Sequence, residues 1–375
     1  MSDPVILSVH PRTVDVSPKT SWSFVEIATD DGLVGTGEAT VNGSADDLKK
    51  AAWAMQDILK GRPASQITVA AATAAGSLDG FTGRAMSCAS EQALWDIAAQ
   101  RAGRPLYDLL GGAVRQRIPM YANINRAPRE RTPQAFAQAA RKAVDAGYRY
   151  IKMAPFDEVD VRQDPAGCVT SMQPGLDRLA AVQQIIGGEA QLMVDAHWRF
   201  DAASAMRLIA AAAELGLVWV ECPIPETAAA IETIRRLRAE ANRRGMWLAG
   251  CERETSLANL LPYLQGGCYD VVMPDVKYVG GVTALLASVR LAAAFGARVA
   301  PHNPTGPVCH MASLHVSAAA PQDGFLMLEH QLGESPLFFD AVTGSVPAAT
   351  GLSQGTCDLP SGPGLGVALR EEFCR

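Results

Sequence analysis

The pattern of apolar and polar positions differs between the first hundred residues and the rest of the chain. Three short strand-like runs come first, and Thr29-Asp-Asp-Gly32 between the second and third is a typical hairpin signal. These runs lie at 5–10, 21–29 and 33–39. Helical periodicity follows over 44–61 and 86–102, and Gly103 marks the end of the second helix. We therefore expect a small α+β domain over residues 1–117.

From Ile118 onward, strand-like runs alternate with helical runs, which is typical of parallel βαβ units. The expected strands lie at 118–122, 149–153, 191–195, 217–221, 246–250, 269–273, 297–301 and 325–329. The expected helices include 132–146, 176–187, 201–215, 228–243, 255–265 and 282–295. About eight such units predict a closed α/β barrel, so we expect a TIM-like barrel over residues 118–339. Residues 340–375 are rich in Gly and Pro, and we expect this tail to return to cover the first domain.

The composition favours a large folded enzyme. The chain has 375 residues, of which 48% are hydrophobic and 19% charged, so it can bury a large core. A net charge of −6 without a dense Lys/Arg run argues against nucleic acid and membrane partners. The start lacks signal-peptide features, no apolar run reaches the roughly 18 residues of a membrane span, and the eight cysteines form no CxxC pair. We expect a cytoplasmic enzyme with reduced thiols.

Three acidic residues follow three successive expected strands. They are Asp195, Glu221 and Glu252. Parallel strands of one barrel point their C-terminal ends toward the same mouth, so these carboxylates would converge there. An oxygen-only site of this kind suits Mg²⁺. The alternative is that each residue is the N-cap of the next helix, but three in consecutive units favour a metal site.

Five further polar residues lie at or just beyond strand ends. They are Lys152, His197, Asp275, His302 and Glu329. A lone Lys or His at a strand end is more often a satisfied polar group, so the argument depends on their shared location. An Asp that accepts a hydrogen bond from one imidazole nitrogen raises the basicity of the other. A metal acidifies the proton α to a bound carboxylate, and a His or Lys base is the expected complement.

Four motifs spread along the chain can be compared with known families. They are the Gly35-Thr-Gly-Glu38 hairpin, the Ala93-Leu-Trp-Asp96 helix, the Leu109-Leu-Gly-Gly112 boundary and the Asp275…Gly280-Gly281 turn. Together they resemble the enolase superfamily, in the branch grouped around mandelate racemase, over nearly the whole chain. The resemblance implies an α+β capping domain on a modified TIM barrel. It also implies a single Mg²⁺ on the three acidic residues; Glu254 is a near alternative to Glu252, but Gly250-Cys-Glu252 better matches the family's Gly-x-Glu strand end.

The resemblance also implies roles for the other strand-end residues. His302 with Asp275 is similar to the family's His–Asp dyad, and Glu329 is similar to the residue that hydrogen-bonds the enediolate oxygen. Many relatives carry Lys-x-Lys at the end of the second barrel strand, but this chain has Lys152-Met-Ala154. A racemase needs acid/base groups on both faces of the α-carbon and alanine moves no proton, so racemisation or epimerisation ranks low.

His197 offers a substitute for the missing lysine. In the galactonate and mannonate dehydratases of the superfamily, a His two residues beyond the first metal ligand takes part in the chemistry, and Asp195-Ala-His197 is similar. The resemblance therefore implies a Mg²⁺-dependent dehydratase of an aldonate or aldarate. His197 would remove the α-proton and His302 would protonate the departing β-hydroxyl, giving a 2-keto-3-deoxy acid. The reverse roles, one His for both, and Lys152 as the base stay open.

The expected partner is a small sugar acid, and rival functions are a lactone cycloisomerase and a non-catalytic sugar-acid sensor. Capping loops are expected to set specificity, from the segments Lys19–Trp22, Val41–Ser44 and Phe81–Arg84. Expected substrate contacts are Trp22, Asn123, Asn125 and Arg199, with Tyr278 a weaker candidate and Lys277 a rim charge. The Ala-rich barrel exterior leads us to expect a homo-oligomer.

Overall fold

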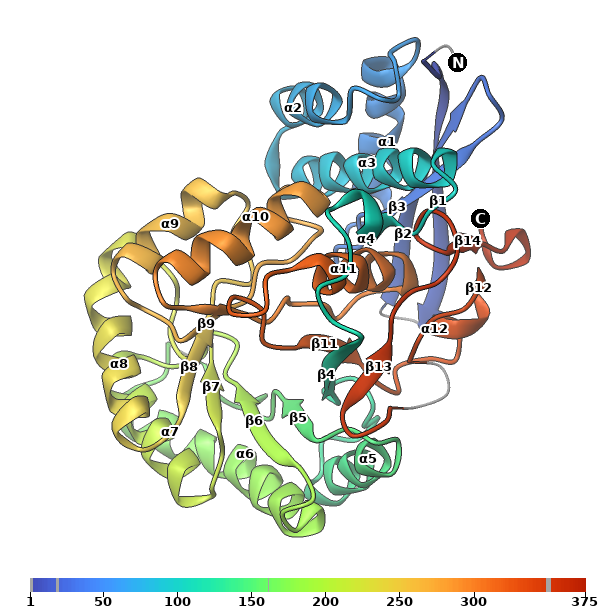
Figure 1. Ribbon diagram of the computed structural model, residues 1–375. Coiled ribbons are helices and arrows are strands. Elements are labelled where there is room, and N and C mark those ends of the chain that lie inside the picture. Colours follow the sequence, from blue (N-terminus) through green and yellow to red (C-terminus); the bar gives the residue numbers. More distant parts are fainter. Residues whose placement is uncertain (1–2, 18–19, 161, 349–351) are drawn as a thin grey trace.

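A three-stranded antiparallel sheet and three helices form the N-terminal capping part (Figure 1). The computed structural model describes residues 3–17, 20–160, 162–348 and 352–375. The strands are β1 (Ile6–Ser17), β2 (Thr20–Thr29) and β3 (Val34–Glu38), and they pair in that order. The helices are α1 (Ala45–Leu59), α2 (Ile67–Ser77) and α3 (Gly80–Arg101). The expected meander is present, with a first strand longer than expected.

The hairpin glycines let this sheet approach helix α3 very closely. A Cβ on Gly35 would lie 2.0 Å from the carbonyl oxygen of Ala93, and a Cβ on Gly37 would lie 1.8 Å from that of Ala89. Only glycine fits at these two positions. The close packing explains why the Gly35–Glu38 hairpin and the helix around Ala93 occur together in this chain.

Eight parallel strands form the barrel, and helices surround it (Figure 1). The strands are β4 (Arg117–Asn123), β5 (Tyr150–Met153), β6 (Gln191–Asp195), β7 (Trp219–Glu221), β8 (Trp247–Gly250), β9 (Val271–Val272), β10 (Arg298–Val299) and β11 (Leu328–Gln331). Neighbours in sequence pair in parallel from β4 to β10, and β11 pairs with β4. A parallel bridge between Val299 and Phe325 closes the ring. The expected fold class is confirmed.

The barrel helices follow the strands in order. They are α5 (Pro133–Asp145), α6 (Pro165–Ile186), α7 (Ala202–Glu214), α8 (Ile231–Arg243), α9 (Leu257–Gln265), α10 (Gly281–Ala294) and α11 (Pro307–Ala319), with a 3₁₀ turn η1 (Ala228–Ala230) before α8. Helix α6 starts earlier than the expected residue 176 and contains Pro174 within its length. Helices α2 and α11 were not predicted, because their small and apolar sequences lack a polar face.

The C-terminal tail contacts both larger parts of the molecule (Figure 1). It contains α12 (Leu337–Asp340), β12 (Val342–Gly344), β13 (Thr356–Asp358), β14 (Val367–Leu369) and the 3₁₀ turn η2 (Glu371–Phe373), and the short helix α4 (Leu106–Leu109) leads into the barrel. Strand β13 pairs with β4, and the backbone of Arg375 exchanges two hydrogen bonds with Thr13. The division into 1–117, 118–339 and 340–375 stays a prediction.

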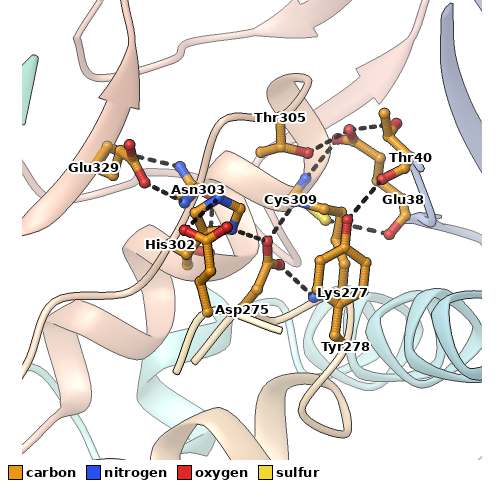
Figure 2. Close-up of polar contacts among 12 residues, drawn as sticks. Glu38, Thr40, Asp275, Lys277, Tyr278, His302, Asn303, Thr305, Cys309 and Glu329 are labelled. Carbon is orange, nitrogen blue, oxygen red and sulfur yellow. Dashed lines mark hydrogen bonds and ion pairs between the residues drawn. The ribbon is translucent and has the colours of Figure 1, made fainter. Parts of the chain in front are cut away.

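Two buried glutamates from the cap join it to the barrel. Glu38 accepts hydrogen bonds from Thr305 Oγ1 (2.6 Å) and from the backbone N–H groups of Gly306 (2.7 Å) and Cys309 (2.9 Å), as Figure 2 shows in part. Glu91 accepts from the backbone N–H of Val282 at the start of α10. These contacts fix the cap over the barrel mouth.

Two general observations complete the fold. All eight cysteines are free thiols, and all except Cys374 are buried. None of the described helices is both long and apolar enough to cross a membrane.

Candidate active site

Three buried carboxylates converge at the mouth of the barrel. Asp195 ends β6, Glu221 ends β7, and Glu252 lies two residues beyond β8. One oxygen from each lies within 4.8 Å of the others. The following helices do not use them as caps, because Asp201 caps α7, Ser256 caps α9 and η1 precedes α8. The alternative that all three are N-caps is therefore wrong.

The same carboxylates have the properties of metal ligands. Among the described residues, Glu221 Oε2 and Glu252 Oε2 accept no hydrogen bond although they are buried. Burial raises the pKa of Glu221 and of Glu252 well above the ordinary range. Burial also acts to raise the pKa of Asp195, but the adjacent His197 and Lys152 outweigh it and hold it at about 2. Oxygen donors that lack partners fit a hard divalent ion, and Glu254 is not part of this group.

The backbone around these ligands has an uncommon conformation. Cys222 follows Glu221 with φ of 43°, and Cys251 precedes Glu252 with φ of 69°. His197 and Trp198, just beyond β6, have φ of 46° and 57°. Non-glycine residues seldom adopt this left-handed region, and each costs roughly 1–3 kcal/mol. Such strain is typical of functional sites, and here it lies next to all three candidate ligands.

The positive charge of Lys152 lies between two buried carboxylates. Its Nζ donates a hydrogen bond to Glu221 Oε1 (2.6 Å) and lies 2.9 Å from Glu329 Oε1. Burial alone would lower the pKa of Lys152, but the two glutamates outweigh it and raise the pKa well above the ordinary value. Lys152 is therefore held in its protonated form.

His302, Asp275 and Lys277 form one hydrogen-bonded group (Figure 2). His302 Nδ1 lies 2.8 Å from Asp275 Oδ2, and Lys277 Nζ donates to the same oxygen at 2.8 Å. The Lys277 backbone N–H donates to Asp275 Oδ1. Lys277 is only 2% exposed, so the expectation that it is a rim charge is wrong. Burial lowers the pKa of His302, and the hydrogen bond to Asp275 opposes that shift.

The free edge of His302 points toward the triad. Its Nε2 lies 3.5 Å from Glu252 Oε2. Because Asp275 accepts a hydrogen bond from Nδ1, Nε2 is the nitrogen left to exchange a proton. The structure thus brings the expected His–Asp pair beside the expected metal ligands.

Glu329, at β11, is fully buried and held at both oxygens. Its Oε1 accepts from Asn123 Nδ2 (2.7 Å) and faces Lys152, while its Oε2 accepts from the Asn303 backbone N–H (2.8 Å). His197 contacts a different member of the triad, since its Nε2 is 2.7 Å from Asp195 Oδ2. The His197 side chain is 39% exposed, so it is the most accessible of the candidate acid/base groups.

A cavity of about 440 Å³ opens over these groups, between cap and barrel. The cap contributes Thr40, Val41, Asn42 and Phe81. The barrel contributes Lys152, Asp195, His197, Glu252, Lys277, Tyr278 and His302. The cavity therefore joins two of the triad carboxylates, Asp195 and Glu252, with both histidines and the capping loops.

The expected substrate contacts divide into two groups. Asn123 and Asn125 line the cavity, but Trp22 and Arg199 do not. Trp22 is buried against Gly306, and its ring lies edge-on to Phe338. This side chain therefore belongs to the hydrophobic core and does not reach the cavity. The Arg199 guanidinium donates to the backbone carbonyls of Asp157 and Val159, in the loop after β5.

The capping segments also contribute unequally. Val41, Asn42 and Phe81 line the cavity, whereas Arg84 donates to the backbone carbonyls of Tyr278 and Val279. Lys19 lies outside the described residues.

Several cavity residues were missed by sequence reasoning. They are Arg126, Trp198, Arg253 and Gln331. Each lies within two residues of a position that was singled out, so adjacency to a strand end is the signal that could have found them. Gln331 Oε1 is buried without a hydrogen-bond partner in the described part of the chain.

Fold and site together define a capped α/β-barrel enzyme with a candidate metal centre of three carboxylates. Comparison with known families agrees. Residues 135–373 match the model of the enolase C-terminal domain-like family, and residues 2–111 match that of the mandelate racemase/muconate lactonizing enzyme N-terminal domain. The chain belongs to the enolase superfamily, in the mandelate racemase-like branch, as its motifs indicated.

Individual relatives cover nearly the whole chain. D-Gluconate dehydratase of Thermoproteus tenax is 30% identical over 98% of this chain and 72% of its own length. D-Galactonate dehydratase of Verminephrobacter eiseniae is 28% identical over 96% of this chain and 91% of its own. Among solved structures, the mandelate racemase/muconate lactonizing enzyme from Sulfitobacter is 25% identical, with a TM-score of 0.86 over 99% of this chain and 94% of its own.

Proposed function

We propose that this enzyme is a Mg²⁺-dependent hydro-lyase that dehydrates a sugar acid to a 2-keto-3-deoxy acid. The observation that carries the proposal is that His302 and His197 line one capped cavity with two carboxylates of the triad, while Asp275 is hydrogen-bonded to His302 behind it. The names of the relatives, D-gluconate and D-galactonate dehydratase, support the same reaction class.

Asp195, Glu221 and Glu252 would hold Mg²⁺, which when bound supplies the positive charge that acidifies the proton α to the substrate carboxylate. We assign removal of that proton to His197. Lys152 is the weaker candidate, because two glutamates keep it protonated. Its positive charge instead stabilises the enediolate oxygen, and Glu329 would donate a hydrogen bond to that oxygen in its protonated form.

His302 completes the elimination. Asp275 holds the proton on Nδ1, so Nε2 exchanges protons with the substrate. In its protonated form, His302 gives the Nε2 proton to the β-hydroxyl as the C–O bond breaks, and water leaves. The resulting enol takes a proton at C3 and becomes the 2-keto-3-deoxy acid. The net change is the loss of one water molecule.

A substrate screen tests the proposal. The Mg²⁺-loaded protein is incubated with aldonic and aldaric acids and their lactones, D-gluconate and D-galactonate included, and 2-keto acids are detected with semicarbazide. We expect a keto acid that disappears with EDTA. Isomerised lactones without keto acid would identify a cycloisomerase instead, and no reaction with any acid would contradict both.

Two variants then separate the histidine roles. His197→Asn should abolish α-proton exchange and dehydration together if His197 is the base. His302→Asn should abolish dehydration while exchange of the α-proton with solvent continues. The opposite pattern would reverse the two assignments.

A further inference from the structure

Four cationic side chains line the cavity, and three of them have acidic partners. Arg126 pairs with Glu334 (3.0 Å), Lys152 with Glu221 (2.6 Å) and Lys277 with Asp275 (2.8 Å). The fourth is Arg253, for which no hydrogen bond or ion pair is found within the described ranges 3–17, 20–160, 162–348 and 352–375. Its positive charge is therefore available to a ligand in the cavity.

Two aromatic rings lie beside the guanidinium of Arg253, which is an exposed residue. Its central carbon lies 5.3 Å from the centre of the Phe81 ring and 5.7 Å from that of the Trp198 ring. The Trp198 ring is itself fixed, because its Nε1 donates to Glu226 Oε2 (3.0 Å). A guanidinium supported on ring faces keeps its N–H edge free, and that edge matches a planar carboxylate.

Arg253 is positioned to contact the end of a substrate that lies farther from the metal site. Arg253 directly follows the candidate ligand Glu252, and Trp198 directly follows His197, so the cation belongs to the same mouth as the triad. Phe81 comes from the cap and its ring packs on Tyr278 at 4.4 Å. The guanidinium thus lies beside a ring that the cap contributes to the same cavity.

We propose that Arg253 binds a second carboxylate at the distal end of the substrate, so that the preferred substrates are dicarboxylic sugar acids rather than monocarboxylic ones. The inference rests on the proposed function, in which the first carboxylate lies at the triad. A terminal CH₂OH group of an aldonate offers no negative charge to Arg253, whereas the terminal carboxylate of an aldarate accepts two N–H hydrogen bonds from it.

Matched substrate pairs test the assignment. Rates of keto-acid formation are measured with the Mg²⁺-loaded enzyme for D-gluconate against D-glucarate and for D-galactonate against galactarate. We expect kcat/KM to favour at least one diacid over its monoacid by roughly 10- to 100-fold, the range expected for a charge-assisted pair. Arg253→Met should remove that preference, with less than about a threefold change for the monoacid. Arg253→Lys, which keeps the charge without the fork, should restore part of it.

Arg236→Met is the control, since Arg236 is an exposed arginine on α8 and does not line the cavity. It should leave both rates unchanged. A wild-type preference for monoacids, or equal losses for both acids in Arg253→Met, would overturn the inference while leaving the dehydratase proposal intact.

Calorimetric titration of the Mg²⁺-loaded protein with each diacid and monoacid gives an independent readout. If no acid is dehydrated, the proposed function fails, but tighter binding of a diacid that is lost in Arg253→Met would still support the anion site. Equal binding of both acids to the wild type would reject it.

Discussion

Replacing Lys152 with methionine tests the electrostatics of the buried site. Lys152 is 1% exposed, and the two carboxylates that it contacts are 0% exposed. Methionine keeps the approximate length of the side chain and removes the charge. In the variant without a metal ion, no cation lies between Glu221 and Glu329. The other two carboxylates of the triad also lose the nearby positive charge.

The expected cost can be worked from this geometry. Removing one partner of a buried ion pair costs about 3–5 kcal/mol. Two unit charges about 4 Å apart at an effective dielectric constant of about 20 interact by about 4 kcal/mol, which is the same order. We expect Lys152→Met to lower the free energy of unfolding by about 3–5 kcal/mol in EDTA. Saturating Mg²⁺ should reduce this loss, because the ion supplies positive charge to the same carboxylates.

The sign of the pH dependence follows from the same charges. Without Lys152, the folded-state pKa of Glu221, which burial already raises above its ordinary value, rises further, and that of Glu329, which Lys152 holds low against burial, rises as well. A carboxyl group of this kind stabilises the fold below its unfolded pKa and loses that contribution as pH rises through the folded one. The variant should therefore lose more stability at neutral pH than in mildly acidic buffer.

Urea unfolding of wild type, Lys152→Met and Lys49→Met measures the effect, with EDTA and with Mg²⁺. Lys49 is exposed on α1, and its variant should stay within about 0.5 kcal/mol of wild type. If Lys152→Met unfolded like Lys49→Met in EDTA, or if Mg²⁺ made no difference to its loss, the charge argument would be refuted.

Three further predictions concern single residues. His302→Asn should lower kcat for keto-acid formation by about 100- to 10,000-fold with an unchanged melting temperature; wild-type turnover would remove His302 from the chemistry. Burial lowers the pKa of His315 to about 4 from about 6.5, so its contribution to stability is present above pH 6.5 and is lost as pH falls toward 4. The free energy of unfolding should fall by about 3 kcal/mol over this pH range because of His315. Urea unfolding at a series of pH values should show a smaller fall for His315→Gln than for wild type, and equal falls would reject this. Gly281→Ala should destabilise more than Gly296→Ala in thermal melts, since both have positive φ but only at Gly281 would the new Cβ meet Glu91 Oε2, at 2.1 Å; equal melting temperatures would show that the cap contact tolerates it.

The barrel could be predicted because its strands alternate with amphipathic helices. Helices α5, α7 and α8 begin and end close to the expected residues, since each presents one apolar face. Helix α11 could not be found in this way, because it is buried on all sides and its sequence has no polar face. Helix α2 is only partly buried, and it was missed because alanine dominates its sequence and gives little contrast between its faces.

The site could be predicted as far as the strand ends define it. Asp195, Glu221 and Glu252 meet because parallel strands bring their C-terminal ends together, which needs no knowledge of loop shape. Lys277 and Trp22 were misjudged, because their burial depends on contacts with residues far away in sequence. Lys277 lies in a loop, which suggested an exposed position at the rim. In the structure it is buried and its ammonium group is paired with Asp275.

The surroundings of Arg253 could not be predicted from the sequence pattern. Its chemistry depends on Phe81 and Trp198, which come from the cap and from a different βα loop. The left-handed backbone at Cys222 and Cys251 is likewise invisible in the sequence, since neither residue type favours it. Sequence periodicity positions the elements, and only the packed structure shows which loop side chains face the cavity.

The most direct test of the central claim is mass spectrometry of the products formed in D₂O by the Mg²⁺-loaded enzyme. Sugar acids that react in the screen are used, with EDTA and His302→Asn as controls. We predict a product that has lost one water and carries deuterium at C3, where the enol takes up its proton, and that is absent with EDTA. A product that keeps the mass of the substrate apart from exchanged deuterium would contradict dehydration and identify an isomerase.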